Sequence, residues 1–174
     1  SAINDWGTTT ANNCTFTENT ATSYGVVYNA SSSTSTYNNC IFHNNSGASS
    51  YDEGYESSGT LTYRKCIISG TIHGNVTQTS TISTSDPSFN NPGSDDFSLS
   101  SSSNAVDAAD ATYAPSDDIL GVSRPQGAGD DVGCYEYLLN TWTGSSSTVW
   151  SNAANWSTGV VPGNSESIVI ANVS

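Results

Sequence analysis

An alternating pattern of polar and apolar positions recurs at a constant period along the first half of the chain. The segments TTTANNCTF, TSTYNNCIF and TLTYRKCII carry it, and they begin at Thr8, Thr34 and Thr60, which defines a 26-residue repeat. A period of about 20 to 50 residues indicates a repeat array, because one repeat cannot bury its apolar face without neighbours. Since side chains of a strand alternate between two faces, the pattern predicts β-strands with the threonine columns on the solvated face.

Each predicted strand ends in two polar residues, and a second apolar run then begins with a cysteine. This shift in the alternation of inward and outward positions indicates a corner of the backbone. Asparagine tolerates the left-handed backbone that a tight corner requires, so we expect Asn13 and Asn39 to stack one coil apart. At ~3.3 Å per residue, one repeat traces about 86 Å, enough for three short strands and three turns. The inward ladder then consists of Cys14, Cys40, Cys66, Phe16, Phe42 and Ile68.

The pattern therefore predicts an all-β fold, a right-handed parallel β-helix in which successive coils pair in parallel. A propeller or a β-sandwich is the alternative, because their strands also alternate. We divide the chain into coils over residues 1–86, a C-terminal cap over 87–139, and the start of a further β-rich module over 140–174. Both ends of the sequence read as the middle of such units, so we expect a fragment of a much longer protein.

The composition favours β-structure and restricts the partners. Lysine, glutamate, leucine and methionine are scarce, whereas serine, threonine, asparagine and glycine are abundant. The formal net charge is −13, and the only cations are Arg64, Lys65 and Arg124. Phosphate backbones and anionic lipid surfaces would be repelled by such a chain. Nucleic acid is thus excluded as a partner, and no apolar stretch is long enough for membrane insertion.

The stacked cysteines allow two interpretations. Cysteines one coil apart lie within the Cα separation that a disulfide accepts, so a bridge from Cys14 to Cys40 is one of them. An inward stack of three cannot pair completely, which favours buried free thiols that act as small apolar side chains. A zinc site is not expected, because the chain lacks CxxC spacing and His43 and His73 do not share a column.

Two sets of motifs carry a resemblance to known families. The first two coils contain the form FxxN, at Phe16 to Asn19 and at Phe42 to Asn45, which resembles the repeats of polymorphic outer-membrane proteins. The stretch from Asp86 to Tyr137 contains the ordered blocks DPxF, DFxL, AVDA, DIxGxxRP and DVGCYE. This stretch resembles the closing segment of choice-of-anchor, pectate-lyase-like β-helix proteins of bacterial surfaces. The stretch from Asn140 onward resembles the opening of a further β-rich unit in surface proteins of Bacteroidetes. The resemblance implies an extracellular, cell-surface location.

The segment resembling a cap has short apolar residues alternating with turn formers, and we expect it to cover the last coil. The stretch from Asp86 to Glu136 contains ten acidic residues and one cation, Arg124. We expect Arg124 to pair with Asp118 or Asp131. No cofactor is expected. A stabilising Ca²⁺ is the one that stays open, because oxygen ligands could converge from six aspartates: Asp107, Asp110, Asp117, Asp118, Asp130 and Asp131.

Three tryptophans, Trp142, Trp150 and Trp156, lie close together in the sequence after Asn140. Because indole rings are amphipathic, these residues either pack at a domain junction or form a platform on which sugars stack. The two roles cannot be separated from the residues alone.

We find no motif that indicates catalysis. Arg64 and Lys65 are adjacent, so their side chains diverge. A glycoside hydrolase needs two carboxylates about 5 to 9 Å apart, and the candidates Asp52, Glu53 and Glu56 read as a solvated acidic loop.

The expected function is therefore non-catalytic: a structural or adhesive segment, an adhesin or stalk, of a large secreted bacterial surface protein. Its expected partners are host or environmental surface glycans or proteins and other segments of the same long chain. The alternatives are a fragment of a polysaccharide lyase or hydrolase, and a carbohydrate-binding module centred on the tryptophans.

Overall fold

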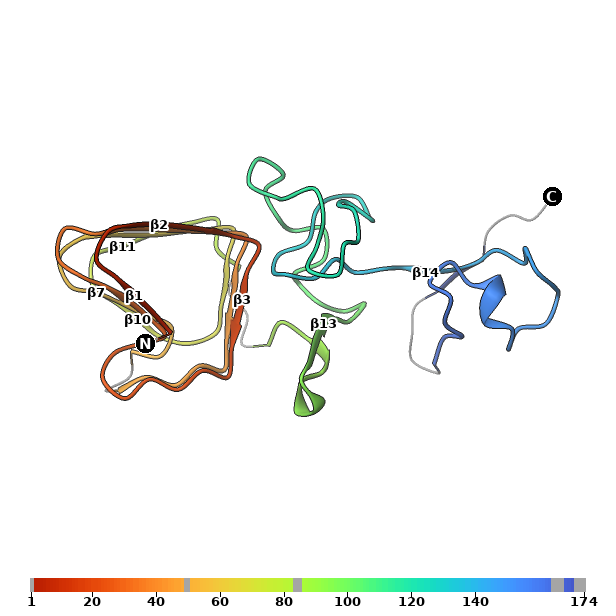
Figure 1. Cartoon of the computed structure of the whole chain (residues 1–174), viewed down its shortest axis with the longest axis horizontal. Helices are drawn as coiled ribbons and strands as arrows, with labels where there is room; N and C mark the ends of the chain where they lie inside the picture. Colours follow the sequence, from red (N-terminus) through yellow and green to blue (C-terminus); the bar gives the residue numbers. More distant parts are fainter. Residues whose placement is uncertain (1, 49–50, 83–85, 164–167, 171–174) are drawn as a thin grey trace.

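Three parallel sheets wind along a common axis in the computed structural model, which describes residues 2–48, 51–82, 86–163 and 168–170 (Figure 1). The first sheet contains β1 (Ile3–Asp5), β4 (Val27–Asn29), β7 (Gly54–Glu56) and β10 (Ile72–His73). The second contains β2 (Thr8–Asn12), β5 (Thr34–Asn38), β8 (Thr60–Arg64) and β11 (Val76–Thr79). The third contains β3 (Thr15–Thr17), β6 (Ile41–His43) and β9 (Ile67–Ile68). This arrangement is a parallel β-solenoid, as the repeat predicts.

The strand register confirms the alignment of the repeats. In the second sheet Thr8 pairs with Thr34 and Thr34 with Thr60. In the third sheet Phe42 pairs with Phe16 on one side and with Ile68 on the other. The threonine columns face outward, although Thr62 is nearly buried between its paired neighbours on β5 and β11.

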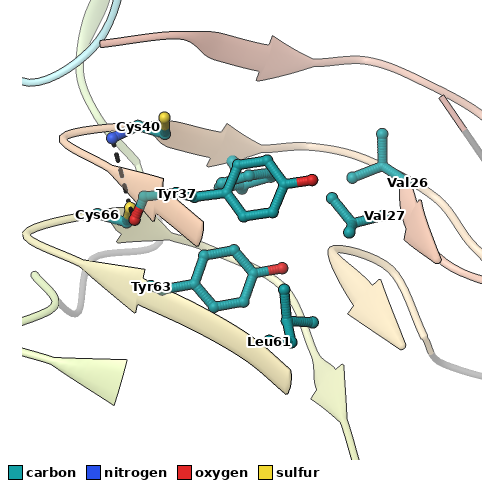
Figure 2. Packing of buried hydrophobic residues seen from close by; sticks show 8 residues of the cluster. Val26, Val27, Tyr37, Cys40, Leu61, Tyr63 and Cys66 are labelled. Carbon is teal, nitrogen blue, oxygen red and sulfur yellow. Dashed lines mark hydrogen bonds between the residues drawn. The ribbon is translucent and has the colours of Figure 1, made fainter. Parts of the chain in front are cut away.

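Aromatic and aliphatic side chains stacked from coil to coil fill the interior of the solenoid (Figure 2). The rings of Phe16 and Phe42 stack with centroids 4.8 Å apart, and those of Tyr37 and Tyr63 with centroids 5.4 Å apart. Phe42 is fully buried and meets both tyrosine rings edge-on. Burial of such rings is the main source of stability in a narrow core that successive coils share.

The cysteine column forms as predicted, and all of its thiols are free. Cys40 and Cys66 are buried, and the amide of Cys40 donates to the sulfur of Cys66 at 3.4 Å (Figure 2). Cys14, in the first coil, is only partly buried. The alternative of a disulfide from Cys14 to Cys40 is therefore not what the structure adopts.

The corner after the second sheet has the predicted left-handed backbone. The φ angles of Asn13, Asn39 and Lys65 are 48°, 53° and 52°. The side-chain amide of Asn39 donates to the side-chain oxygen of Asn13 at 3.1 Å, so the asparagine ladder is hydrogen-bonded. The asparagines of the FxxN motif form a second ladder, in which Asn19 donates to Asn45 at 3.0 Å.

Residues 86–139 lie beside the solenoid and not over its last coil, which corrects our prediction for this segment (Figure 1). Its hairpin of β12 (Phe89–Asn91) and β13 (Asp96–Leu99) packs with Val132 against Ile41 and Ile67. These isoleucines point outward from the third sheet, because Phe42 and its coil-mates take the inward positions. An outward apolar column needs a cover, and the lateral segment supplies it.

Hydrogen bonds to the asparagine corner fix the lateral segment in place. The Asn39 side chain accepts from the amide of Asp110 at 2.8 Å and donates to its carbonyl at 2.9 Å. The Asn13 side chain donates to the carbonyl of Asp131 at 2.8 Å. The corner thus serves twice, as a ladder between coils and as a docking site for the segment.

Residues after 139 form a small unit around β14 (Asn140–Trp142), which pairs in parallel with β15 (Ile168–Ile170). A short 3-10 turn at Ala153–Asn155 lies between them. Asn155 is fully buried, and its side-chain oxygen accepts from the amides of Ser146 and Ser147 at 2.8 Å each.

Candidate functional site

The structure brings the three predicted tryptophans together. Trp142 and Trp150 stack with ring centroids 5.3 Å apart and planes 17° apart, and Trp156 meets both edge-on, at 5.1 and 4.5 Å. Trp156 is 3% exposed, and its indole nitrogen donates to the backbone carbonyl of Trp150 at 3.0 Å. Trp156 thus packs like a core residue against the other two rings, whereas Trp150 is 47% exposed. Stacking of sugars on this cluster stays a prediction.

The six aspartates proposed for Ca²⁺ act mainly as acceptors for the backbone of the lateral segment. Asp118 accepts from the amides of Leu120, Val122 and Glu136. Asp107 accepts from the amide of Gly129, and Asp110 from that of Thr112. Asp117 accepts from the hydroxyl of Ser116. Within the described ranges, no three His, Cys, Asp or Glu side chains are grouped so that they could hold a metal ion.

Asp131 lies buried at the contact between the lateral segment and the solenoid. Its carboxylate accepts from the amides of Asp107 at 2.7 Å and Tyr137 at 2.5 Å. Desolvation outweighs these hydrogen bonds and raises the pKa of Asp131 to about 6, and the nearby charges of Glu136 and Asp107 act in the same direction. This group is therefore poised to titrate under mildly acidic conditions.

Arg124 pairs with Glu136 and not with Asp118 or Asp131, which corrects our prediction. The two side chains are about equally buried, and the guanidinium lies 2.7 Å from the carboxylate. Arg124 also donates to the backbone carbonyls of Asp131 and Gly133, each at 2.9 Å. Its planar fork thus joins three positions of one loop. A structural role for Arg124 agrees with this geometry.

The acidic loop is not solvated as predicted. Glu53 is fully buried and accepts from the side-chain amide of Asn45 at 2.6 Å, and burial raises its pKa. Glu56 is also buried, and it accepts from the amides of Gly59 and Asn75. Glu56 faces inward because Tyr55 takes the outward position on β7, whereas Glu53 precedes the strand and is buried against Asn45 and Ser69. The two carboxylates therefore serve as hydrogen-bond acceptors within the turns of the solenoid.

The corner cations and the two histidines do not converge on a shared site. Arg64 donates weakly to the Asn38 side chain at 3.4 Å, and Lys65 occupies the left-handed corner position. His43 packs edge-on against Phe89 of the lateral segment, and burial lowers its pKa. His73 lies on the first sheet, next to Tyr51.

A row of aromatic rings on the outer face of the first sheet was missed by sequence reasoning. Strand pairing aligns Tyr28 with Tyr55 and Tyr55 with His73. Because Val27 and Asn29 on either side of Tyr28 are buried, this column faces outward. We call the row the aromatic stripe, and it consists of Trp6, Tyr24, Tyr28, Tyr51, Tyr55 and His73.

The rings of the aromatic stripe are in continuous contact. Tyr24 stacks on Tyr28 at 4.3 Å and on Tyr55 at 5.2 Å, with planes 18° and 21° apart. Tyr51 contacts Tyr55 at 4.9 Å and His73 at 4.5 Å. Trp6, in the turn between β1 and β2, meets Tyr28 at 6.4 Å with an interplanar angle of 68°. Trp6 is 72% exposed and Tyr24 is 39% exposed.

A sequence signal for the aromatic stripe exists at a different period. The pair Tyr24 and Tyr28 recurs as Tyr51 and Tyr55, at a spacing one position longer than that of the cysteine column. The alignment of the repeats follows the second and third sheets, so it places these tyrosines out of register. A second period, tested for outward positions, would have found the stripe.

An open groove of about 730 Å³ separates the β12–β13 hairpin from the unit after residue 139. Its acidic lining residues are Asp96, Asp118 and Glu136. Asp96 accepts from Ser98, Asp118 from the amide of Glu136, and Glu136 from Arg124, so all three are already engaged. The aromatic stripe is thus the better candidate for contact with a ligand.

Comparison of the chain with known protein families, with curated proteins and with solved structures finds no match. Among the described residues, no helix has the length and apolar character that crossing a membrane requires.

Proposed function

We propose that this chain is a non-catalytic, adhesive segment of a large secreted bacterial surface protein, in which the β-solenoid is a rigid rod. The exposed aromatic stripe is the observation that supports an adhesive role. Monomeric proteins rarely expose contiguous apolar surface unless it contacts a partner. Sites built on strands are held more rigidly than sites on loops, and Tyr28, Tyr55 and His73 all lie on strands of one sheet.

The resemblance of the stretch from Asp86 to Tyr137 to choice-of-anchor β-helix proteins supports an extracellular, cell-surface location. The resemblance of the stretch from Asn140 onward to surface proteins of Bacteroidetes supports an origin in that group. The proposed partners are surface glycans or proteins and neighbouring segments of the same long chain. The carboxylates that a hydrolase would use favour the rod over an enzyme, since Glu53 and Glu56 are buried and engaged in hydrogen bonds.

The experiment is a paired assay of retention and turnover. Beads coated with the folded chain are passed over surfaces coated with bacterial, plant or animal polysaccharides, while the same polysaccharides are incubated with the soluble chain. We expect retention on at least one surface and no release of new reducing ends or unsaturated products. Turnover of any polysaccharide would refute the non-catalytic role. If the beads adhere to none of the surfaces, the adhesive role is refuted.

A further inference from the structure

We propose that the aromatic stripe binds a neutral glycan chain lying along the solenoid axis, with Trp6 as the main stacking platform. This inference rests on the proposed adhesive function and gives it a site and a ligand class. It differs from the alternative of a module centred on Trp142, Trp150 and Trp156, because the stripe lies on the first sheet of the solenoid and its main platform is the more exposed Trp6.

Trp6 has free ring surface in a place where burial would have been favourable. Its side chain is 72% exposed, against 39% for Tyr24. Its contact with Tyr28 is of the edge type, with centroids 6.4 Å apart, so the two rings do not stack face to face. A contiguous exposed apolar patch marks a contact surface, and Trp6 is joined to such a patch through Tyr28.

The tyrosines of the stripe present a different chemistry from Trp6. Tyr24, Tyr28 and Tyr55 stack with nearly parallel planes, so they cover part of each other's faces. Among the described residues, the hydroxyls of the four tyrosines make no hydrogen bond within the chain. Each hydroxyl is then able both to donate and to accept.

A glycan fits both parts of this surface. A pyranose ring has a face of C–H groups that packs on an amphipathic aromatic ring, and its hydroxyls pair with phenolic hydroxyls. Successive coils are ~4.8 Å apart, and the stripe runs from Trp6 in the first coil to His73 in the last. Several sugar residues can therefore lie along it.

Charge restricts the glycan to a neutral one. The chain carries a formal charge of −13, and its three cations lie elsewhere. Arg64 and Lys65 are at the corner after the second sheet, and Arg124 is buried against Glu136. Acidic polysaccharides would meet repulsion with no cation in the stripe to offset it. The rings form an extended row, whereas a quaternary ammonium group is held by a cage of rings.

The test uses isothermal titration of the whole chain with neutral hexasaccharides of β-glucan, xylan, mannan and galactan. Polygalacturonate fragments and choline are the comparison ligands. We expect binding of at least one neutral hexasaccharide, with a blue shift of tryptophan emission. Trp6→Ala should raise the Kd on the order of tenfold, as expected for a stacked aromatic anchor, and should abolish the emission shift. Tyr24→Ala should weaken binding less, because Tyr24 is less exposed.

Trp150→Ala is the matched control, because Trp150 is also exposed, at 47%, but lies outside the stripe. We expect its Kd to equal that of the parent. Circular dichroism and thermal melting show whether each variant is folded. Because Trp6 is largely in water, Trp6→Ala should melt as the parent does. The double variant Tyr28→Phe with Tyr55→Phe keeps the rings and removes two hydroxyls, and it should bind several-fold more weakly.

Several outcomes would overturn the proposal. These are unchanged binding by folded Trp6→Ala, loss of binding only in Trp150→Ala, and preference for polygalacturonate or for choline over every neutral hexasaccharide. Absence of binding to all neutral probes, while coated beads still adhere to a surface, would refute the glycan stripe and leave the adhesive function standing. Failure of adhesion as well would refute both.

Discussion

Replacing Phe42 with alanine should lower the free energy of unfolding of the solenoid more than a conservative substitution on the solenoid surface does. Phe42 is fully buried, it stacks on Phe16 at 4.8 Å, and its edge contacts with Tyr37 and Tyr63 are at 5.3 and 5.2 Å. A buried Phe→Ala change costs about 3 to 5 kcal/mol, because the cavity only partly collapses. The substitution also removes three aromatic pairs, each worth ~0.5 to 1.5 kcal/mol. We therefore expect a loss in the upper part of the Phe→Ala range, at about 4 to 5 kcal/mol.

Urea unfolding, followed by the far-ultraviolet circular dichroism of the β-sheets, measures this loss as a lower midpoint at an unchanged slope. The control is Phe16→Ala, which removes the same group from the same column. Phe16 is only partly buried, so we expect roughly half of the loss seen for Phe42. Equal midpoints for the parent and Phe42→Ala, or a larger loss for Phe16→Ala, would contradict the stacking register.

Three further predictions concern buried polar groups. Arg124→Ala should lower the free energy of unfolding in urea by about 3 to 5 kcal/mol, because it leaves Glu136 buried without its partner. Combining Arg124→Met with Glu136→Gln should recover most of this loss. If the double variant recovers none of it, the loss is not an effect of the unpaired charge. Tyr63→Phe should leave stability unchanged or raise it by about 1 kcal/mol, because its buried hydroxyl has no partner within the described residues; a clear loss would refute this. The raised pKa of Asp131, about 6 against 3.8 for the free group, means that the folded state holds this proton more tightly. The stability of the parent relative to Asp131→Asn should therefore fall as the pH rises from about 4 to about 6, and a constant difference between them would contradict it.

The inward columns were predictable because they depend on a single physical requirement. Each coil must place an apolar ring or thiol under that of the next, so the spacing between Phe16, Phe42 and Ile68 is kept constant. The corner follows for the same reason, since only a few residues accept a φ near 50°, as Asn13 and Asn39 do. The sequence pattern is therefore almost sufficient to predict the fold of the coils.

The position of the lateral segment was not predictable from the same pattern. Alternation divides each strand into two faces, and the outward face was taken to be solvated throughout. Ile41 and Ile67 break that assumption, and their apolar side chains define where Phe89 and Val132 pack. The partner of Arg124 could not be chosen among ten carboxylates, because that choice depends on how the loop from Asp131 to Glu136 folds back.

The aromatic stripe differs from the core because its spacing is not uniform. In the first sheet Ile3 pairs with Val27 and Val27 with Gly54, and the second of these steps along the chain is longer than the first. The second sheet instead keeps one constant step between β2, β5 and β8. Most of the difference lies in the turn between the first and second sheets, which is longer in the second coil, and the rest lies in the loop between the third sheet and the first, where Tyr24 and Tyr51 are found. A solenoid tolerates length changes in such loops, since the strands on both sides still pair. Rings that project from these loops and from the adjacent strands can therefore vary without disturbing the core, which is where a surface adapted to a particular ligand is expected to arise.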